Sequence, residues 1–266
     1  MKIADFKTTI EELLADTGKR PVVVFTAVWP FLRALDAPAS DVPRLMLQSL
    51  QEIVDGRNLI MPTFTHGYKG GICNLDEEPS STGIVSEMMR CLPESQRNLT
   101  AFFPYSILGP DAAEFADLRP EYAWGDHSAY HWMEQKNASF LMIGTHPTHC
   151  SFLHRMEWLA REKINYRYVK TFSGTIIRDK KEHQMVENLY VRVLSPRMIN
   201  DFTKIYDQLK NNGMKVVKLD GINMAHMTAA DMKETYLNAL LQDPLISVKN
   251  REDFEQNDSA YHKECN

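Results

Sequence analysis

The sequence predicts an α/β protein in which helices cover both faces of a mixed central sheet, a three-layer α/β/α fold. Two observations predict it. Apolar runs of strand length alternate with longer segments of helical periodicity, an order typical of α/β folds. Strand-like runs around a turn in the second half of the chain also indicate a β-hairpin. Because no repeat or Pro/Gly/Ser-rich linker divides the chain, we expect one domain over residues 1–248.

The first half supplies most of the predicted layers. Residues 3–15 place apolar side chains at helical spacing, and Gly18 ends the segment. The apolar run 21–26 is typical of a short buried strand. A Gly-rich, acidic stretch at 67–79 is interpreted as a surface loop. By the same criteria, helices are expected at 41–54 and 82–89, and further strands at 58–62, 99–108 and 138–144.

The second half begins with short strand-like runs and ends with helices. The turn Asp179-Lys180-Lys181 separates two strand-like regions, which predicts the hairpin. From residue 249 the chain is charged and nearly free of aliphatic side chains, so residues 249–266 are expected to form a disordered tail. Strands are predicted at 166–170, 174–177, 189–193 and 215–219, and helices at 199–210 and 229–241.

Composition argues against several classes of function. The formal net charge is −5 and basic residues are scattered, which disfavours a nucleic-acid-binding protein. The four cysteines have no C-x-x-C spacing and do not indicate a disulfide framework. No apolar run approaches the roughly 20 residues that a membrane helix needs. The N-terminal residues do not resemble a signal peptide, so a cytoplasmic location is expected.

The stretch Cys150–Glu157 is the strongest candidate site, because it follows the predicted strand 138–144 and has S-x-x-H-x-x-E spacing. On a helix, His154 and Glu157 lie three residues apart and share one face. Ser151 is a good N-cap, which places its hydroxyl near backbone N–H donors. A base, a carboxylate that orients it and an electropositive helix end are what acyl transfer requires. The same spacing is also common in surface ion pairs.

Other interpretations of the same region stay open. His146, His149, His154 and Glu157 together supply enough ligands for zinc, although no H-E-x-x-H pattern is present. Cys150 is interpreted as a packing thiol rather than a nucleophile, because neighbouring residues on an extended segment point to opposite sides. Farther along the chain, Arg167 and Lys170 are either solvated strand-edge charges or a phosphate-binding pair.

Taken in order, these segments resemble the aminoglycoside 3-N-acetyltransferase family. The likeness is to a branch found in surface-polysaccharide synthesis, whose members are expected to acylate sugar amines. It runs from about residue 20 to residue 247. Its most specific parts are Ser151–Glu157 and Tyr166–Gly174, and its supporting parts are Leu59–Phe64, Pro79–Arg90, Gly125–Ser128 and Asp243–Leu245.

The resemblance implies a role for each matching residue. His154 would be the general base in acyl transfer from acyl-coenzyme A, Glu157 would orient it or hold the substrate ammonium, and Ser151 would donate to the developing oxyanion. Acetyl-coenzyme A or another acyl-coenzyme A is the expected co-substrate, with no metal. Coenzyme A is expected near Thr26, Ala27, Ser81, Thr82, Gly83 and Ser106, and the acceptor near Thr63, Tyr166, Arg167 and Lys170.

Two departures from the family pattern fall on the expected coenzyme A side. Phe25-Thr26-Ala27 stands where the family has His-Ser-Ser, and Pro104-Tyr105-Ser106 is a shortened Pro-x-x-Ser segment. These departures do not touch the base. A neutral imidazole accepts a proton from an attacking amine at cytoplasmic pH, so direct transfer needs no covalent intermediate.

The leading hypothesis is therefore a coenzyme A-dependent N-acyltransferase, most simply an N-acetyltransferase, acting on the amine of an amino sugar. The sugar is a small molecule that can be nucleotide-linked, and a homodimer stays open. Two alternatives are a metal-dependent hydrolase using the histidine cluster and a non-catalytic carbohydrate-binding protein with the same fold.

Overall fold

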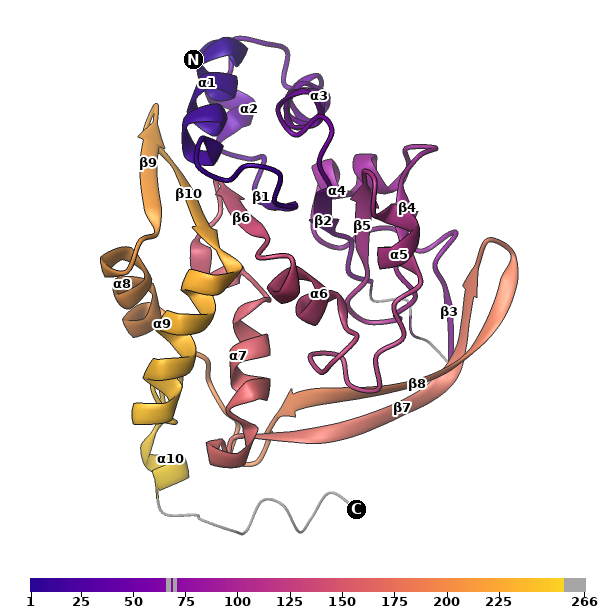
Figure 1. The fold of residues 1–266 in the computed structure, drawn as a ribbon, viewed down its shortest axis with the longest axis vertical. Coiled ribbons are helices and arrows are strands. Elements are labelled where there is room, and N and C mark those ends of the chain that lie inside the picture. Colours follow the sequence, from indigo (N-terminus) through magenta and orange to yellow (C-terminus); the bar gives the residue numbers. More distant parts are fainter. Residues whose placement is uncertain (66–67, 69–70, 256–266) are drawn as a thin grey trace.

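A computed structural model describes residues 1–65, 68 and 71–255, and its central feature is a mixed seven-stranded sheet (Figure 1). Strand β1 lies at the centre and pairs in parallel with β2 and β6, whereas the outer pairs are antiparallel. In spatial order the strands are β4 (Gln96–Arg97), β5 (Tyr105–Leu108), β2 (Leu59–Pro62), β1 (Val22–Thr26), β6 (Ser139–Ile143), β10 (Ile222–Thr228) and β9 (Lys215–Leu219).

Helices cover both faces of this sheet. Alternate residues of β1 point to opposite sides, so Val22 and Val24 pack in one core cluster and Val23 and Phe25 in another. The first cluster lies under α1 and α3, and the second under α6, α7 and α9. The predicted three-layer α/β/α fold is confirmed. The longer helices are α1 (Ile3–Leu14), α3 (Val42–Ile53), α8 (Thr203–Asn211) and α9 (Ala229–Gln242).

The shorter helical elements connect these layers. Four are single-turn helices or 3₁₀ turns: α2 (Phe31–Ala34), α10 (Glu252–Glu255), η1 (Pro147–His149) and η2 (Arg161–Lys163). The others are α4 (Ile84–Arg90), α5 (Ala112–Ala116), α6 (Ala129–Gln135) and α7 (Leu153–Leu159). In the described part of the chain, no helix is long and apolar enough to cross a membrane.

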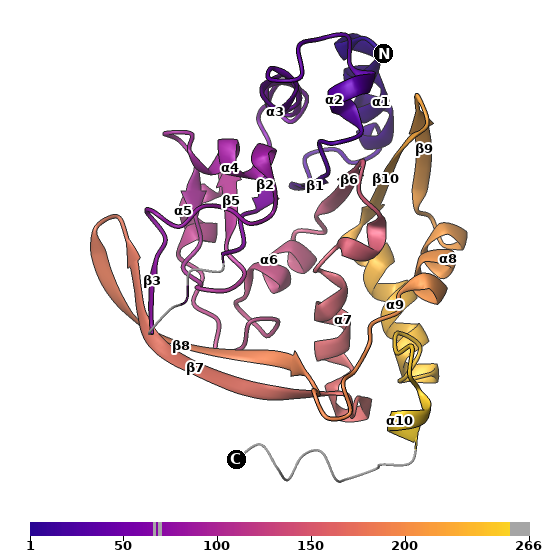
Figure 2. The ribbon, with the colours of Figure 1, turned by 180° about the vertical axis from the view of Figure 1, so that it is seen from behind.

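A long hairpin stands apart from the central sheet and runs along one side of the molecule (Figure 2). Strands β7 (Arg167–Arg178) and β8 (Lys181–Arg192) pair over their full length, and β3 (Ile72–Asn74) joins β7 in parallel. Asp179 and Lys180 form the connecting turn with φ of 54° and 60°, the left-handed conformation that two-residue hairpin turns need. The predicted hairpin is present, and the two strands expected at 166–170 and 174–177 are one continuous strand.

The structure differs from the sequence prediction at three other places. Strand β10 was not predicted, although it lies between β6 and β9 in the sheet. The strand expected at 99–108 begins only at Tyr105. The loop expected at 67–79 contains β3, which pairs with the hairpin, and residues 66–67 and 69–70 lie outside the described part.

The expected boundary at residue 248 also shifts. Residues 252–255 form α10, and Phe254 is buried in the core. Asn250 accepts a hydrogen bond from the Ile199 N–H and donates one to the Arg197 carbonyl. A single aromatic side chain therefore holds a charged segment that composition alone assigns to a tail. Residues 256–266 of the expected tail lie outside the described residues.

Candidate active site

The chain reaches the candidate site through a tight turn at the end of β6. Gly144 has φ of 68°, and a Cβ atom there would meet the Ala27 carbonyl oxygen at 2.6 Å. Only glycine combines that conformation with that close approach. The turn leads through η1 into α7, which places His154 at one side of a cavity of about 640 Å³ and carries the buried Glu157 three residues further on. We call this space the His154 cavity; Ser151, Trp124 and Phe64 line it as well.

His154 and Glu157 form a tight pair, as their spacing predicts. The His154 Nδ1 atom lies 2.6 Å from Glu157 Oε2. The Glu157 side chain is completely buried, whereas a quarter of the His154 side chain is exposed to the cavity side. An ionised carboxylate only accepts hydrogen bonds, so the proton of the neutral imidazole is on Nδ1, which donates a hydrogen bond to Glu157. The Nε2 atom is then the ring nitrogen that can accept a proton.

Glu157 is also held by residues from the hairpin and the C-terminal segment. Arg167 Nε lies 3.0 Å from Glu157 Oε2, and the Tyr166 hydroxyl donates to Oε1 at 3.1 Å. The Ser247 hydroxyl approaches the same oxygen at 3.4 Å. Buried carboxylates persist when they are paired and hydrogen-bonded in this way. The base therefore rests on a carboxylate that is itself fixed on several sides.

These surroundings shift the pKa values of both groups. Burial alone would raise the pKa of Glu157, but the positive charge of Arg167 and the contact with His154 bring it down to about 2. Burial and the nearby Arg167 lower the pKa of His154, against the opposing effect of Glu157. At neutral pH the pair is therefore a carboxylate beside a neutral imidazole, the state that a general base requires.

Ser151 faces the same cavity, but it does not cap α7. The helix begins at Leu153 with Phe152 before it, so the predicted N-cap is wrong. Instead the Ser151 hydroxyl lies 2.8 Å from the hydroxyl of Tyr105. Burial raises the pKa of Tyr105 well above its usual range, so the phenol keeps its proton and can donate it to Ser151. The Ser151 proton is then available to a group in the cavity.

Five residues predicted to bind coenzyme A line one second cavity of about 520 Å³, which we call the Thr26 cavity. Its lining also includes Trp29, whose side chain is 78% exposed. The two cavities are neighbours, because the Phe64 ring lines the first while its carbonyl accepts hydrogen bonds from the Ser81 N–H and hydroxyl, at 2.8 and 2.9 Å. The five predicted residues are Thr26, Ala27, Ser81, Thr82 and Gly83.

Thr63 and Ser106 do not belong to either cavity. Both side chains are completely buried, and the Ser106 hydroxyl donates to Thr63 Oγ1 at 3.2 Å. Thr63 in turn donates to the Pro104 carbonyl. These hydroxyls are used in joining β2 to β5, so the structure does not bring Thr63 or Ser106 to either cavity, and their contacts with the acceptor and with coenzyme A stay predictions.

The three hairpin residues predicted to bind the acceptor have different surroundings. Tyr166 is fully buried, and its hydroxyl contacts Glu157 and Ser247 rather than open space, so it positions the carboxylate. Arg167 lines the His154 cavity, but its guanidinium group forms an ion pair with Glu157. Lys170 lines the cavity and is exposed, with its ammonium 5.3 Å from the centre of the Phe172 ring.

The residues proposed as alternative metal ligands do not converge. His146 lines another cavity and its ring packs 4.4 Å from that of Tyr206. His149 Nδ1 lies 3.2 Å from the Thr145 hydroxyl, and the rings of His146 and His149 are 6.4 Å apart. Among the described residues, no group of three or more His, Cys, Asp or Glu side chains is placed to hold a metal ion. The cluster predicted for a hydrolase is therefore not assembled.

Cys150 is buried, and this burial raises the pKa of its thiol to about 12. A thiol that keeps its proton is a poor nucleophile. The interpretation of Cys150 as a packing residue agrees with this environment.

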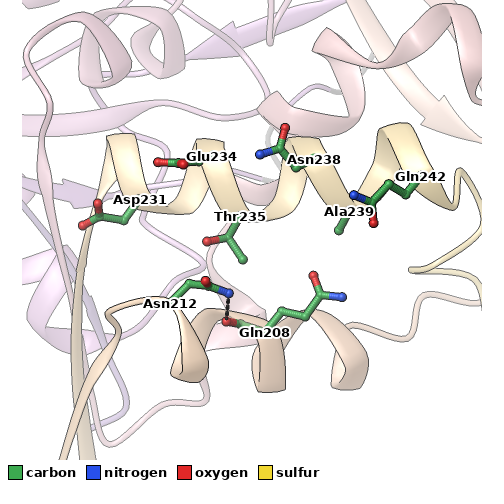
Figure 3. Close-up of a pocket in the computed structure, with 8 residues that line it drawn as sticks. All are labelled: Gln208, Asn212, Asp231, Glu234, Thr235, Asn238, Ala239 and Gln242. Carbon is green, nitrogen blue, oxygen red and sulfur yellow. Dashed lines mark hydrogen bonds between the residues drawn. The ribbon is translucent and has the colours of Figure 1, made fainter.

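A third cavity lies between α8 and α9, away from the histidines (Figure 3). Its walls are amides, carboxylates and a hydroxyl, including Gln208, Asn238 and Glu234. One of its carboxylates, Asp231, is already bonded to the Thr228 hydroxyl at the start of α9. This groove contains no histidine, and none of the predicted site residues lines it.

Sequence reasoning missed several residues that build the site. Tyr105 and Ser247 lie within or beside segments that were noticed, but spacing alone gave no sign that they contact Ser151 and Glu157. Arg192 was not singled out, yet it lines the His154 cavity opposite Arg167 in the β7–β8 register. Pairing across the hairpin was the available signal, because it places the start of one strand beside the end of the other.

The three-layer α/β/α fold, with a His–Glu pair beside a cavity, is typical of an acyltransferase-like enzyme. Residues 32–240 match the sequence profile described as aminoglycoside 3-N-acetyltransferase. The chain belongs to that family. Membership confirms the resemblance described from the sequence and the predicted enzyme class, a coenzyme A-dependent N-acyltransferase, and it indicates that the acyl group is acetyl.

Solved structures with the same fold agree with this assignment. The chain is similar to AAC-IIIb in its binary complex with CoASH, with 15% identity, a TM-score of 0.73, and 89% of this chain and 96% of that one covered. It is similar to sisomicin-bound AAC-VIa, with 19% identity, a TM-score of 0.69 and coverage of 88% and 96%. The corresponding values for YokD from Bacillus subtilis are 15%, 0.68, 89% and 99%. No curated protein sequence matches the chain.

Proposed function

We propose that this enzyme transfers an acetyl group from acetyl-coenzyme A to the amine of a small amino sugar, with His154 as the general base. The observation that carries the proposal is the 2.6 Å contact between His154 Nδ1 and the buried Glu157 carboxylate, at the wall of a cavity large enough for a sugar. The sisomicin complex of AAC-VIa shows an aminoglycoside bound by a protein of the same fold. That precedent supports an amine-bearing sugar as acceptor.

His154 performs the proton transfer in this scheme. Its Nε2 takes a proton from the acceptor amine as the nitrogen attacks the thioester carbonyl carbon. Glu157 fixes the ring and stabilises the imidazolium that forms. When the tetrahedral intermediate collapses, the C–S bond breaks and the thiolate leaves, taking the proton back from His154. The products are an amide and free coenzyme A.

Ser151 is placed to stabilise the intermediate. With Tyr105 as the donor in the bond between the two hydroxyls, the Ser151 proton is free to be donated to the oxygen that gains negative charge. The charge develops beside aromatic side chains that include Trp124 and Phe103, in a cavity that basic residues of the hairpin line on another side. A hydrogen bond made in such surroundings is stronger than one made in water.

The Thr26 cavity is the proposed site for coenzyme A. It offers the hydroxyls of Thr26, Ser81 and Thr82 as hydrogen-bonding groups. Trp29 adds an exposed aromatic face at the same cavity. Helix α4 has only seven residues, so the cavity wall rather than the helix dipole is the support for this assignment. The thioester is the chemical group that the bound donor supplies.

A direct assay tests the proposed function. The enzyme is incubated with acetyl-coenzyme A and a panel of amino sugars, and free thiol release is followed. We expect turnover that depends on the acceptor amine and disappears when the amine is already acetylated. Binding of acetyl-coenzyme A is measured separately by isothermal titration. Absence of both binding and transfer would contradict the proposal, whereas sugar binding without transfer would support the carbohydrate-binding alternative.

A further inference from the structure

The His154 cavity has a cationic wall on its hairpin side. Arg167, Lys170 and Arg192 all line it. Its lining, as far as the chain is described, contains no aspartate or glutamate. The Glu157 carboxylate is buried behind this wall, where it pairs with Arg167 and His154. Lys170 and Arg192 therefore face the cavity without a negative partner to balance them.

The strand register places two of these cations side by side. Arg167 is the direct partner of Arg192 across β7 and β8. Like charges in this position destabilise a hairpin. Glu157 neutralises Arg167, but the ion pairs of the described residues include none for Lys170 or Arg192. An anion bound between Lys170 and Arg192 would offset the repulsion between Arg192 and Arg167.

The cationic wall also acts on His154. The Arg167 guanidinium lies 3.2 Å from His154 Nδ1, and Arg167 and Arg192 both lower the pKa of the imidazole, after the larger effect of burial. The same positive field lowers the pKa of an ammonium group bound beside it, which increases the fraction of free amine. It also repels a molecule with several ammonium groups.

Aromatic side chains lie beside the cations. Tyr168, Phe172 and Tyr190 come from the hairpin, and Phe202 and Trp124 lie near the His154 ring, with centroid distances of 6.0 and 5.9 Å. Such faces pack against sugar rings and planar heterocycles. A wall of aromatic faces and unbalanced cations is suited to a phosphorylated sugar, with or without an attached nucleoside.

We propose that the acceptor is an amino sugar that carries a phosphate or diphosphate ester, with its anionic group held by Lys170 and Arg192. This inference rests on the proposed function and narrows its substrate class. It sets the enzyme apart from the sisomicin-binding AAC-VIa in the acceptor charge that it selects. The acceptor amine then lies at His154, while the anionic group lies toward the open end of the hairpin pair.

Competing acceptors test this selection. Acetyl transfer is compared for glucosamine, glucosamine 1-phosphate, UDP-glucosamine and the polycation gentamicin. We expect kcat/KM for at least one anionic acceptor to exceed that for glucosamine by about 10-fold or more, a difference that shrinks as salt is raised. In Lys170→Gln and Arg192→Gln this preference falls by about 10-fold for each cation removed. Lys181→Gln, at the far end of the hairpin, is the matched control and keeps the preference.

Binding separates this inference from the proposed function. Glucosamine 1-phosphate, UDP-glucosamine, UDP alone and gentamicin are titrated into the enzyme loaded with coenzyme A. Anionic probes that bind in a Lys170- and Arg192-dependent manner support the inference even if no acceptor is acetylated, in which case only the proposed function fails. Binding of UDP alone identifies the nucleotide as the source of the anion, and binding of glucosamine 1-phosphate without UDP identifies the sugar phosphate. Stronger binding of gentamicin, no binding of any anionic probe, or an unchanged preference in both variants overturns the inference.

Discussion

The His154 cavity and the Thr26 cavity adjoin each other, but different interactions form them. Around His154, the buried Glu157 carboxylate contacts the imidazole, the Arg167 guanidinium and the hydroxyls of Tyr166 and Ser247, which come from α7, the hairpin and the C-terminal segment. Around Thr26, the walls are hydroxyls and apolar side chains, with no charged group in the lining of the described residues. Chemistry requires charges held in fixed places, whereas binding of a long co-substrate needs mainly shape.

The comparison predicts that single substitutions have much larger effects at His154 than at Thr26. Many weak contacts share the energy of binding, so the loss of one is tolerated. No other group replaces a general base or a buried counterion. Removing the base therefore lowers the rate by its whole contribution, and removing the counterion leaves a buried charge unpaired.

Replacing His154 with alanine should produce the largest loss of activity. We expect kcat for acetyl transfer to fall by about 10²–10⁴-fold, the usual contribution of a general base. The affinity for coenzyme A should stay close to that of the intact enzyme, because His154 does not line the Thr26 cavity. Steady-state thiol release and isothermal titration measure the two quantities. Retention of full kcat in His154→Ala would show that another group takes the proton.

Glu157→Gln tests the ionic network through stability. Removing one partner of a buried pair leaves Arg167 without its counterion, which typically costs about 3–5 kcal/mol of unfolding free energy. Glu162→Gln is the control, because that carboxylate is exposed and changes of this kind stay within roughly 0.5 kcal/mol. Urea denaturation of both variants measures the difference. If Glu157→Gln lowers the free energy of unfolding no more than Glu162→Gln does, the ion pair between Glu157 and Arg167 does not stabilise the fold.

The pH dependence of stability follows from the same pair. The pKa of Glu157 is about 2 in the folded protein and near 4.5 when unperturbed, so its stabilising effect is present above about pH 4.5 and is lost as pH falls toward 2. The pKa of His154 is lowered on folding, so stability also declines as pH falls below 6.5, where only the unfolded state binds that proton readily. Urea denaturation at a series of pH values measures this dependence. In Glu157→Gln, the fall in the free energy of unfolding below pH 4.5 should be smaller than in the intact enzyme, because the titrating carboxylate is absent.

How much of this could be predicted from sequence differs between the two cavities. His154 and Glu157 are local to one helix, so their three-residue spacing predicted the contact. The partners of Glu157 come from positions 166, 167 and 247, and no local pattern encodes a contact that depends on how the hairpin folds over α7. Helix periodicity likewise predicted the layers, whereas β10 and the buried Phe254 depend on long-range packing.

The donor-side residues show a different limit. Thr26 and Ser81–Gly83 were predicted only through the family resemblance, and they do share one cavity. Ser106 and Thr63 were predicted on the same basis, but their hydroxyls join β2 to β5. A hydroxyl in a strand can face a ligand or a neighbouring strand, and the sequence does not distinguish these two directions without the register.

Ser151→Ala tests the oxyanion role and is expected to lower kcat by about 10²–10³-fold, the usual cost of removing one such donor. KM for both substrates should change little, because the hydrogen bond strengthens only as charge develops. Tyr105→Phe is the matched variant: it removes the phenol that orients Ser151 and should cause a smaller loss, about 2–10-fold. A rise in KM with kcat unchanged in Ser151→Ala would instead assign the hydroxyl to substrate binding.

Thr26→Val should have the smallest effect of the set and tests whether the Thr26 cavity holds coenzyme A. The substitution keeps the shape of the side chain and removes one hydrogen-bonding group, so the dissociation constant for coenzyme A should rise by about 2–10-fold, with kcat nearly unchanged. Thr9→Val, on the outer face of α1, is the control and should leave binding unaltered. If Thr26→Val lowers kcat as strongly as Ser151→Ala, the two cavities are not divided between binding and chemistry, and the thioester itself lies against Thr26. If Thr26→Val changes neither coenzyme A binding nor turnover, coenzyme A contacts other lining residues of this cavity, and Trp29→Ala becomes the next variant to measure.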